Sequence, residues 1–277
     1  MNRRHPALFI GHGSPLQAIE PSRYTAAWEH LGRTLPRPRA IVVVSAHWVT
    51  NGTAVTTATL PATIHDFHGF PAALYQLQYP ARGDALLAAQ VQGLLAPIQV
   101  RADTEWGLDH GSWSVLRYMY PAADIPTLQV SIDANLTPRA HYQLGRHLGA
   151  LRDEGVLILG SGNVVHNLRA LQASATAPAL AWASEFNDAL RAAVLAGNHD
   201  TLIDYQAMGS AARLSVPTAE HYLPLLYVLG TQSGEDAVSI PIDGIDLGAI
   251  SMLCVSLHGA ETIGVTAPGS GEVLPAL

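Results

Sequence analysis

The chain has 277 residues, of which 48% are hydrophobic and 13% charged, and its formal net charge is −7. This is the composition of a globular protein with a large core, and an acidic chain without clustered Lys and Arg is not expected to bind nucleic acid. The single cysteine, Cys254, excludes an intramolecular disulfide and a thiolate metal cluster. No apolar run is long enough for a signal peptide or for a membrane span of roughly 18 residues, so we expect a cytoplasmic protein that does not contact a membrane.

The first half of the chain predicts strands and helices in alternation. The first strand is apolar throughout and runs into Gly11. Ser22 is a suitable cap for the helix that follows, and Pro36 ends that helix. The second strand is continuously apolar, as expected of a strand covered on both faces. In chain order we expect a strand at 7–10, a helix at 22–35, strands at 40–46 and 53–59, a loop at 64–71, a helix at 84–95, a strand at 98–101 and a loop at 105–113.

The second half continues the same alternation. Thr137 followed by Pro138 is a strong helix start, because it combines a capping hydroxyl with a proline at the first helical position. Gly155 supplies the stop before the next strand. In chain order we expect a strand at 127–131, a helix from 137 to 155, a strand at 156–159, helices at 179–196 and 217–229, a strand at 250–257 and a loose tail from about residue 262.

Strands and helices alternate without a break that resembles a linker. This pattern predicts an α/β fold with three layers, in which helices cover both faces of a central, mostly parallel or mixed sheet. We therefore expect residues 1–277 to form a single catalytic domain.

Histidine is unusually frequent, with 13 residues against 15 Lys plus Arg. His12, His47 and His166 each follow a predicted strand, and the carboxyl ends of strands are where open α/β sheets hold their ligands. His221 opens the helix predicted after Pro217. A site gathered from such distant segments is typical of a catalytic metal rather than of a zinc finger. We place the remaining candidates on the surface, namely His5, His30, His141, His147 and His199.

Without thiolates, a site of neutral imidazoles favours Fe(II) or zinc. Glu220 could add a carboxylate, but it neighbours His221 and both side chains are not expected to reach one ion. We prefer His221 as the ligand, and Glu220 is then an acid in the first turn of a helix, where the helix dipole favours it.

Competing motifs are absent or incomplete. Neither Ser14 nor Ser161 lies in the G-x-S-x-G frame of a nucleophile elbow, and no phosphate-binding lysine follows the glycines at 160 and 162. The H-E-x-x-H pattern of zinc proteases does not occur. Cys254 lies within an apolar strand and is expected to be inert core.

Six segments of the chain, taken together, resemble the class III extradiol ring-cleavage dioxygenases, and specifically their DOPA-dioxygenase-type branch. Any one segment is a weak signal, but the set is specific because it spans residues 7 to about 230 in order. The segments are GHGSP at 11–15, SAHW at 45–48, IHDFHGFP at 64–71, GLDHG at 107–111, GSGNVVHNL at 160–168 and PTAEHY at 217–222.

The resemblance implies a single metal ion, Fe(II) for activity and zinc in some preparations, held by His12, His47 and His221. It implies that His166 is the acid–base residue and lies close enough to serve as a fourth ligand, and that His110 is a second catalytic histidine. His221 stands where the wider class uses a glutamate, so the metal site is more positive than in those enzymes. In the 64–71 loop, His65 and Asp66 are expected to bind substrate.

The implied reaction is the opening of a catechol such as DOPA by O₂ to give a muconic semialdehyde, with the catechol and O₂ as the partners of the protein. Aromatic residues that could line a ring-sized pocket are Trp48, Phe67, Phe70 and Tyr222. Two alternatives belong to other functional classes. One is a non-enzymatic metal- or peptide-binding protein of the same fold, and the other is a zinc hydrolase.

Overall fold

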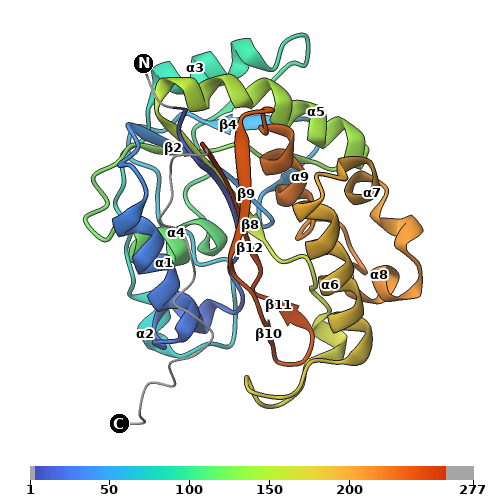
Figure 1. Ribbon diagram of the computed structural model, residues 1–277. Helices are drawn as coiled ribbons and strands as arrows, with labels where there is room; N and C mark the ends of the chain where they lie inside the picture. Colours follow the sequence, from blue (N-terminus) through green and yellow to red (C-terminus); the bar gives the residue numbers. More distant parts are fainter. Residues whose placement is uncertain (1–3, 260–277) are drawn as a thin grey trace.

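The computed structural model describes residues 4–259, so the loose tail expected from about residue 262 lies outside the described part. A six-stranded sheet with the order β6-β2-β8-β1-β12-β9 lies between two layers of helices (Figure 1). The predicted α/β fold with three layers and a mixed, mostly parallel sheet is therefore confirmed.

Four strands of the sheet are parallel. They are β1 (Ala7–Gly11), β2 (Ala40–Ser45), β6 (Thr127–Gln129) and β8 (Val156–Gly162). On the other side of β1, β12 (Cys254–Gly259) pairs antiparallel with β1. The edge strand β9 (Asp236–Ile242) pairs antiparallel with β12. Ser161 of β8 pairs with Ile10 of β1 and with Ser45 of β2, so the carboxyl ends of three parallel strands stop at the same edge.

The strands are apolar throughout because both faces of the sheet are covered. Leu8 and Ile10 of β1 point to one core cluster, whereas Ala7 and Phe9 point to the other. Strand side chains alternate in this way between the two faces, so a continuous apolar run is what a strand buried on both sides requires. The first cluster packs against α1 (Arg23–Thr34) and α4 (His110–Met119), and the second against α3 (Ala85–Leu94), α5 (Pro138–Leu148), α6 (Ala181–Leu195) and α9 (Leu223–Gly230) (Figure 1).

Two of the predicted helix starts are confirmed by their capping contacts. The Ser22 hydroxyl accepts a hydrogen bond from the backbone N–H of Thr25, and the Thr25 hydroxyl accepts one from the backbone N–H of Ser22. Thr137 caps α5 through the backbone N–H of Ala140. Gly155 adopts φ = 77°, the left-handed conformation that ends the helical segment before β8.

Two predicted boundaries were wrong at places that matter for the site. The loop expected at 105–113 ends earlier, because Asp109 caps α4 and the helix begins at His110. The helix expected at 217–229 begins at Leu223. The carbonyl of His221 accepts a hydrogen bond from the backbone N–H of Asn163 at the end of β8, so residues before Leu223 form a turn against the sheet.

Other differences concern strands. The segment predicted at 250–257 is divided between β11 (Ile250–Ser251) and β12, and β9 was not expected. The strand expected at 98–101 lies further along, and it pairs with the strand expected at 53–59 in a small parallel sheet of its own. The remaining elements are β3 (Val49–Thr50), β4 (Ala54–Thr56), α2 (Ala72–Tyr75), β5 (Arg101–Asp103), β7 (Ile132–Asp133), α7 (His199–Ile203), α8 (Ser210–Ser215), β10 (Ile245–Asp246) and β11 (Ile250–Ser251).

Two of the histidines expected at the surface are buried. His5 is 4% exposed, with its ring nitrogens against the carbonyls of Pro6 and Pro36. His141 is fully buried between α5 and α9, with Nδ1 3.0 Å from the Tyr227 hydroxyl. Cys254 is buried as expected.

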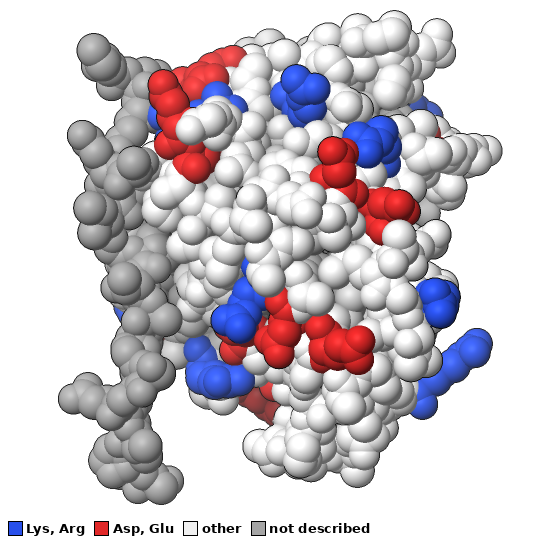
Figure 2. All heavy atoms as spheres, turned by 45° about the vertical axis from the view of Figure 1, so that its right-hand side comes forward, with Lys and Arg blue, Asp and Glu red and all other residues white. Residues whose placement is uncertain are grey.

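Charged side chains are sparse on the surface. The cationic side chains are all arginines, and on the face shown in Figure 2 some lie beside Asp or Glu and others stand alone, separated by broad uncharged areas. Within residues 4–259, no helix is both long and apolar enough to cross a membrane.

Candidate metal centre and active site

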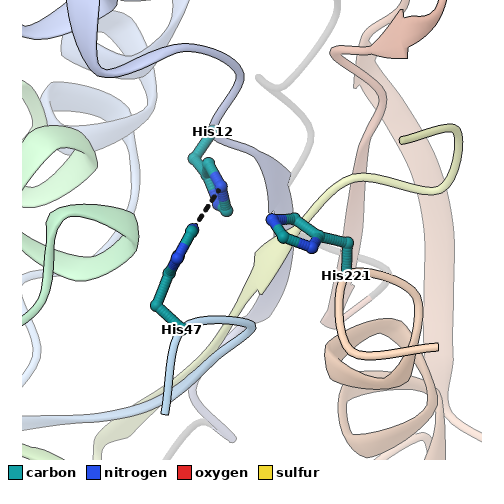
Figure 3. A group of neighbouring side chains, drawn as sticks. All are labelled: His12, His47 and His221. Atoms are coloured by element: carbon teal, nitrogen blue, oxygen red, sulfur yellow. Dashed lines mark hydrogen bonds between the residues drawn. The ribbon is translucent and has the colours of Figure 1, made fainter. Parts of the chain in front are cut away.

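Three histidines from distant segments meet at the edge of the sheet where β1, β2 and β8 end. His12 follows β1, His47 follows β2, and His221 lies in the turn before α9 (Figure 3). Nε2 of His12 lies 3.1 Å from Nε2 of His47. One ring nitrogen from each of the three lies within 4.8 Å of the corresponding nitrogen of the other two. Figure 3 shows the three rings pointing toward one common point.

The glycines that flank His12 are required by this geometry. A Cβ on Gly11 would lie 2.7 Å from the Cα of Met252, so only glycine allows the chain to pass there. Gly13 has φ = 65°, which disfavours other residues. The backbone can therefore turn directly after β1 and present His12 at the end of the strand.

The other ring nitrogen of each histidine has an oxygen partner. The Ser161 hydroxyl donates to the carbonyl of Gly111, so it accepts a hydrogen bond from Nδ1 of His12 at 2.9 Å. Nδ1 of His47 lies 3.2 Å from Oδ2 of Asp66. Nδ1 of His221 lies 3.2 Å from Oε1 of Glu220.

These contacts determine the chemistry of the three rings. Carboxylates only accept hydrogen bonds, so each Nδ1 carries a proton and each Nε2 keeps a free lone pair. Nε2 of His12 and Nε2 of His47, 3.1 Å apart, are close enough for both to bind one ion at about 2.0–2.1 Å in place of a shared proton. Metal-binding histidines commonly donate their second N–H to a carboxylate or hydroxyl in this way. The three histidines therefore fit a metal ion.

The environment keeps these rings neutral, with one exception. Burial, reinforced by the neighbouring histidines, holds the pKa of His12 and of His221 well below the usual range. At His47 burial also lowers the pKa, but Asp66 and other nearby carboxylates together raise it above its ordinary value. Burial raises the pKa of Asp66, but its contacts with His110 and His47 outweigh this and hold the pKa well below the usual range.

Two further histidines border the same centre. The ring of His166 stacks on the ring of His221, with centroids 3.5 Å apart and planes 7° from parallel. The ring of His110 lies 4.0 Å from the ring of His47. His166 does not belong to the group of three within 4.8 Å, and instead forms a neighbouring group with Glu220 and His221.

A cavity of about 270 Å³ opens directly over the histidines. All five rings contribute to its wall, together with apolar side chains that form its rim. Leu168 and Leu171 of this rim are 62% and 39% exposed. Beyond the histidines, the cavity is lined by Gly13, Ser14, Pro15, Phe70, Leu168, Leu171, Leu247 and Ile250.

The residues expected to bind substrate do not line this cavity. Nε2 of His65 lies 3.0 Å from the carbonyl oxygen of Leu77, and Asp66 contacts His47 and His110. Both residues therefore have protein partners rather than a place on the cavity wall. Of the four aromatic residues expected near a pocket, Phe70 lines the cavity, whereas Trp48, Phe67 and Tyr222 are buried in the protein.

Two supporting contacts were missed from the sequence. Ser161, considered only as a possible nucleophile, instead contacts His12 through its hydroxyl. Glu220, expected in the first turn of a helix, lies in the turn before α9 and contacts His221. The contact of Glu220 could have been expected, because this residue is next to the candidate ligand His221 in the sequence. The role of Ser161 depends on the pairing of β8 with β1, which no local pattern reveals.

Comparison with known proteins identifies the family of the chain. The family described as the catalytic LigB subunit of aromatic ring-opening dioxygenase matches residues 7–244. The chain belongs to this family. Its members depend on a metal, so the cluster of His12, His47 and His221 lies in a family whose chemistry requires such a centre.

Individual relatives extend the comparison over most of the chain. A 4,5-DOPA dioxygenase extradiol from Escherichia coli (strain K12) is 51% identical, over 92% of this chain and 95% of the relative. One from Beta vulgaris is 39% identical, over 83% of this chain and 87% of the relative. The crystal structure of an uncharacterized protein from Escherichia coli K12 is similar with a TM-score of 0.80 and 47% identity, covering 91% of this chain and 99% of that one. The protein is thus an extradiol aromatic ring-opening dioxygenase, and the resemblance seen in the sequence is confirmed.

Proposed function

We propose that this protein, as a single catalytic domain over residues 1–277, opens the ring of a catechol such as DOPA with O₂. The carbon–carbon bond next to the diol breaks, one new end becomes a carboxylate and the other an aldehyde, and both atoms of O₂ enter the muconic semialdehyde. The observation that carries this proposal is the convergence of five histidines on one cavity of about 270 Å³ with an apolar rim. The names of the relatives from Escherichia coli and Beta vulgaris support the choice of DOPA.

In this proposal His12, His47 and His221 hold Fe(II) through their free Nε2 atoms. When bound, Fe(II) supplies a place where the diol oxygens and O₂ meet and exchange electron density. Neutral imidazoles suit iron and zinc alike, so zinc could occupy the same three nitrogens in the isolated protein.

His166 is the proposed general base. Burial lowers the pKa of His166 to about 4, against the opposing effect of Glu220, so its ring is neutral near pH 7 and can accept a proton from a catechol hydroxyl. Its stacking on His221 keeps the ring beside the metal ligands. We also predict that His166 binds the metal as a fourth ligand when no substrate is present.

His110 is the proposed second proton carrier. Its ring lines the cavity, and its Nδ1 lies 3.0 Å from Asp66. The carboxylate keeps a proton on Nδ1 and leaves Nε2 to exchange a proton with the substrate as the ring opens. The apolar rim of Phe70, Leu168 and Leu171 surrounds the bound ring and limits the access of water.

Oxygen uptake tests this function directly. Protein loaded with Fe(II) under anaerobic conditions should consume O₂ when DOPA or caffeate is added, and the absorbance of a semialdehyde should appear. His166→Ala should lose at least about 100-fold in kcat, because a general base contributes roughly 10²–10⁴-fold. It should retain bound metal.

His199→Ala, which lies outside the site, serves as the control and should keep wild-type turnover. Turnover that survives in His166→Ala would contradict the assignment of the base. Tight zinc binding by the wild-type protein without O₂ uptake for any catechol would contradict the dioxygenase and favour a zinc hydrolase or a binding protein.

A further inference from the structure

We propose that Asp66 is a positioning residue that joins the metal centre to the proton-transfer machinery, orienting His47 for the metal and His110 for the substrate with one carboxylate. The inference rests on the proposed function, because it takes His47 as a metal ligand and His110 as a proton carrier. It also gives a role to the acidic residue of the 64–71 segment, which the cavity leaves unexplained.

The carboxylate lies between the two rings. Oδ2 of Asp66 is 3.2 Å from Nδ1 of His47 and 3.0 Å from Nδ1 of His110. Oδ1 accepts a hydrogen bond of 2.9 Å from the backbone N–H of His110, at the first residue of α4. The side chain of Asp66 is only 16% exposed, so these contacts are largely shielded from water.

Because one oxygen atom contacts both rings, the two histidines cannot be arranged independently. The negative charge of Asp66 beside each Nδ1 favours the tautomer with the proton on that nitrogen, which leaves Nε2 of each ring for the centre. Nε2 of His47 then faces Nε2 of His12 at 3.1 Å, and the ring of His110 lies 4.0 Å from that of His47 at the cavity wall. Removal of the negative charge should therefore weaken metal binding and proton transfer together.

Asp66 also supports the start of α4, so a purely structural role must be separated from positioning. Asp66→Asn keeps an oxygen for the backbone N–H of His110 but loses the charge and one acceptor for the rings. Asp103 provides a matched control, because its carboxylate also accepts backbone hydrogen bonds, from the N–H groups of Glu105 and Trp106, but contacts an arginine rather than a histidine.

The first measurement does not depend on activity. Titration with Co(II), followed by its visible spectrum, and competition with a zinc chelator should show that Asp66→Asn binds metal roughly 10–100-fold more weakly, as is usual when a group that orients a ligand is lost. Asp103→Asn should bind metal as the wild type does. An Asp66→Asn protein with wild-type metal affinity and an unchanged Co(II) spectrum would overturn the link to His47.

The second measurement uses Fe(II) at saturating concentration. Asp66→Asn should lower kcat at least about tenfold while changing the KM for the catechol less than threefold, since His110 acts on the proton rather than on binding. In a His110→Ala background, the further effect of Asp66→Asn on kcat should disappear, because the residue it orients is gone.

Equal effects of Asp66→Asn in both backgrounds would overturn the link to His110. If the wild-type protein consumes no O₂ with any catechol, the proposed function fails, while the Co(II) titration still decides whether Asp66 orients a metal ligand.

Discussion

At the residue scale, burial favours the neutral form of histidines both inside and outside the candidate centre. His141 shows the effect free of any role in the site, because it lies between α5 and α9 with Nδ1 on the Tyr227 hydroxyl. Burial lowers the pKa of His141 to about 4, and the nearby carboxylate of Asp133 offsets only part of this. The same physical cause keeps His166 neutral in the centre.

This predicts a specific dependence of stability on pH. The pKa of His141 is about 4 in the folded protein and 6.5 in its absence, so the unfolded chain binds the proton first as the pH falls. Stability is lost between about pH 6.5 and pH 4, and His141 accounts for about 2 kcal/mol of the loss between pH 7 and pH 5. Urea unfolding of the metal-free proteins should show that the free energy of unfolding falls by about 2 kcal/mol less in His141→Asn than in the wild type between pH 7 and pH 5.

His147 lies on the same helix with an exposed side chain, so His147→Asn is the matched control and should lose as much stability on acidification as the wild type. An equal loss in His141→Asn and the wild type would mean that another group carries the acid sensitivity.

At the element scale, the end of β8 positions the segment that carries His221. The carbonyl of Gly162 accepts a hydrogen bond from the backbone N–H of His12, and the next residue, Asn163, donates to the carbonyl of His221. A Cβ on Gly162 would lie 2.2 Å from that same carbonyl. The turn before α9 therefore packs closely against the end of β8, and this contact brings His221 near His12.

Gly162→Ala should displace the turn that holds His221. Overpacking of this kind typically costs about 1–3 kcal/mol in the free energy of unfolding, and here the moved residue is a proposed ligand, so metal affinity should fall as well. Unfolding in denaturant and zinc competition measure the two effects.

Gly93→Ala is the control for this substitution. Gly93 lies within α3 with no atom within 4 Å of an added Cβ, and alanine there should raise stability by up to about 1 kcal/mol without affecting the metal. Gly162→Ala with wild-type metal affinity and stability would show that the turn can yield without moving His221.

At the scale of the whole molecule, the metal should act as a link between distant segments. His12, His47 and His221 together span more than 200 positions of the sequence. An ion that binds only the folded chain therefore adds its binding energy to folding. A ligand at 100 times its Kd stabilises by about 2.7 kcal/mol, which in a protein of this size corresponds to a rise in Tm of roughly 5–10 °C.

Thermal unfolding with and without zinc, or with Fe(II) under anaerobic conditions, should show this rise in the wild type and its loss after chelation. His12→Ala should show little or no rise. His65→Ala, whose ring contacts the carbonyl of Leu77 and lies away from the cavity, should keep it. A rise of equal size in His12→Ala would place the ion elsewhere.

The sequence by itself determined the layers, the parallel strands and the candidate ligands. Continuous apolar runs require a sheet covered on both sides, and histidines that directly follow such runs must come to the carboxyl edge of that sheet. Glycines on both sides of His12 also indicate, from the local sequence, a tight turn that presents this histidine at the end of a strand. Each of these signals lies within a few neighbouring residues. Many of them fall in the six segments that resemble the dioxygenases.

Only the tertiary structure decided which oxygen atoms orient those ligands and where the chain bends between elements. The contact of Ser161 with His12 depends on the pairing of β8 with β1, and the contact of Asp66 with two rings depends on the placement of a loop against α4. The turn before α9 contacts the end of β8 through a hydrogen bond from the backbone N–H of Asn163 to the carbonyl of His221. Such contacts join groups that are remote in the chain, so local propensity carries no information about them.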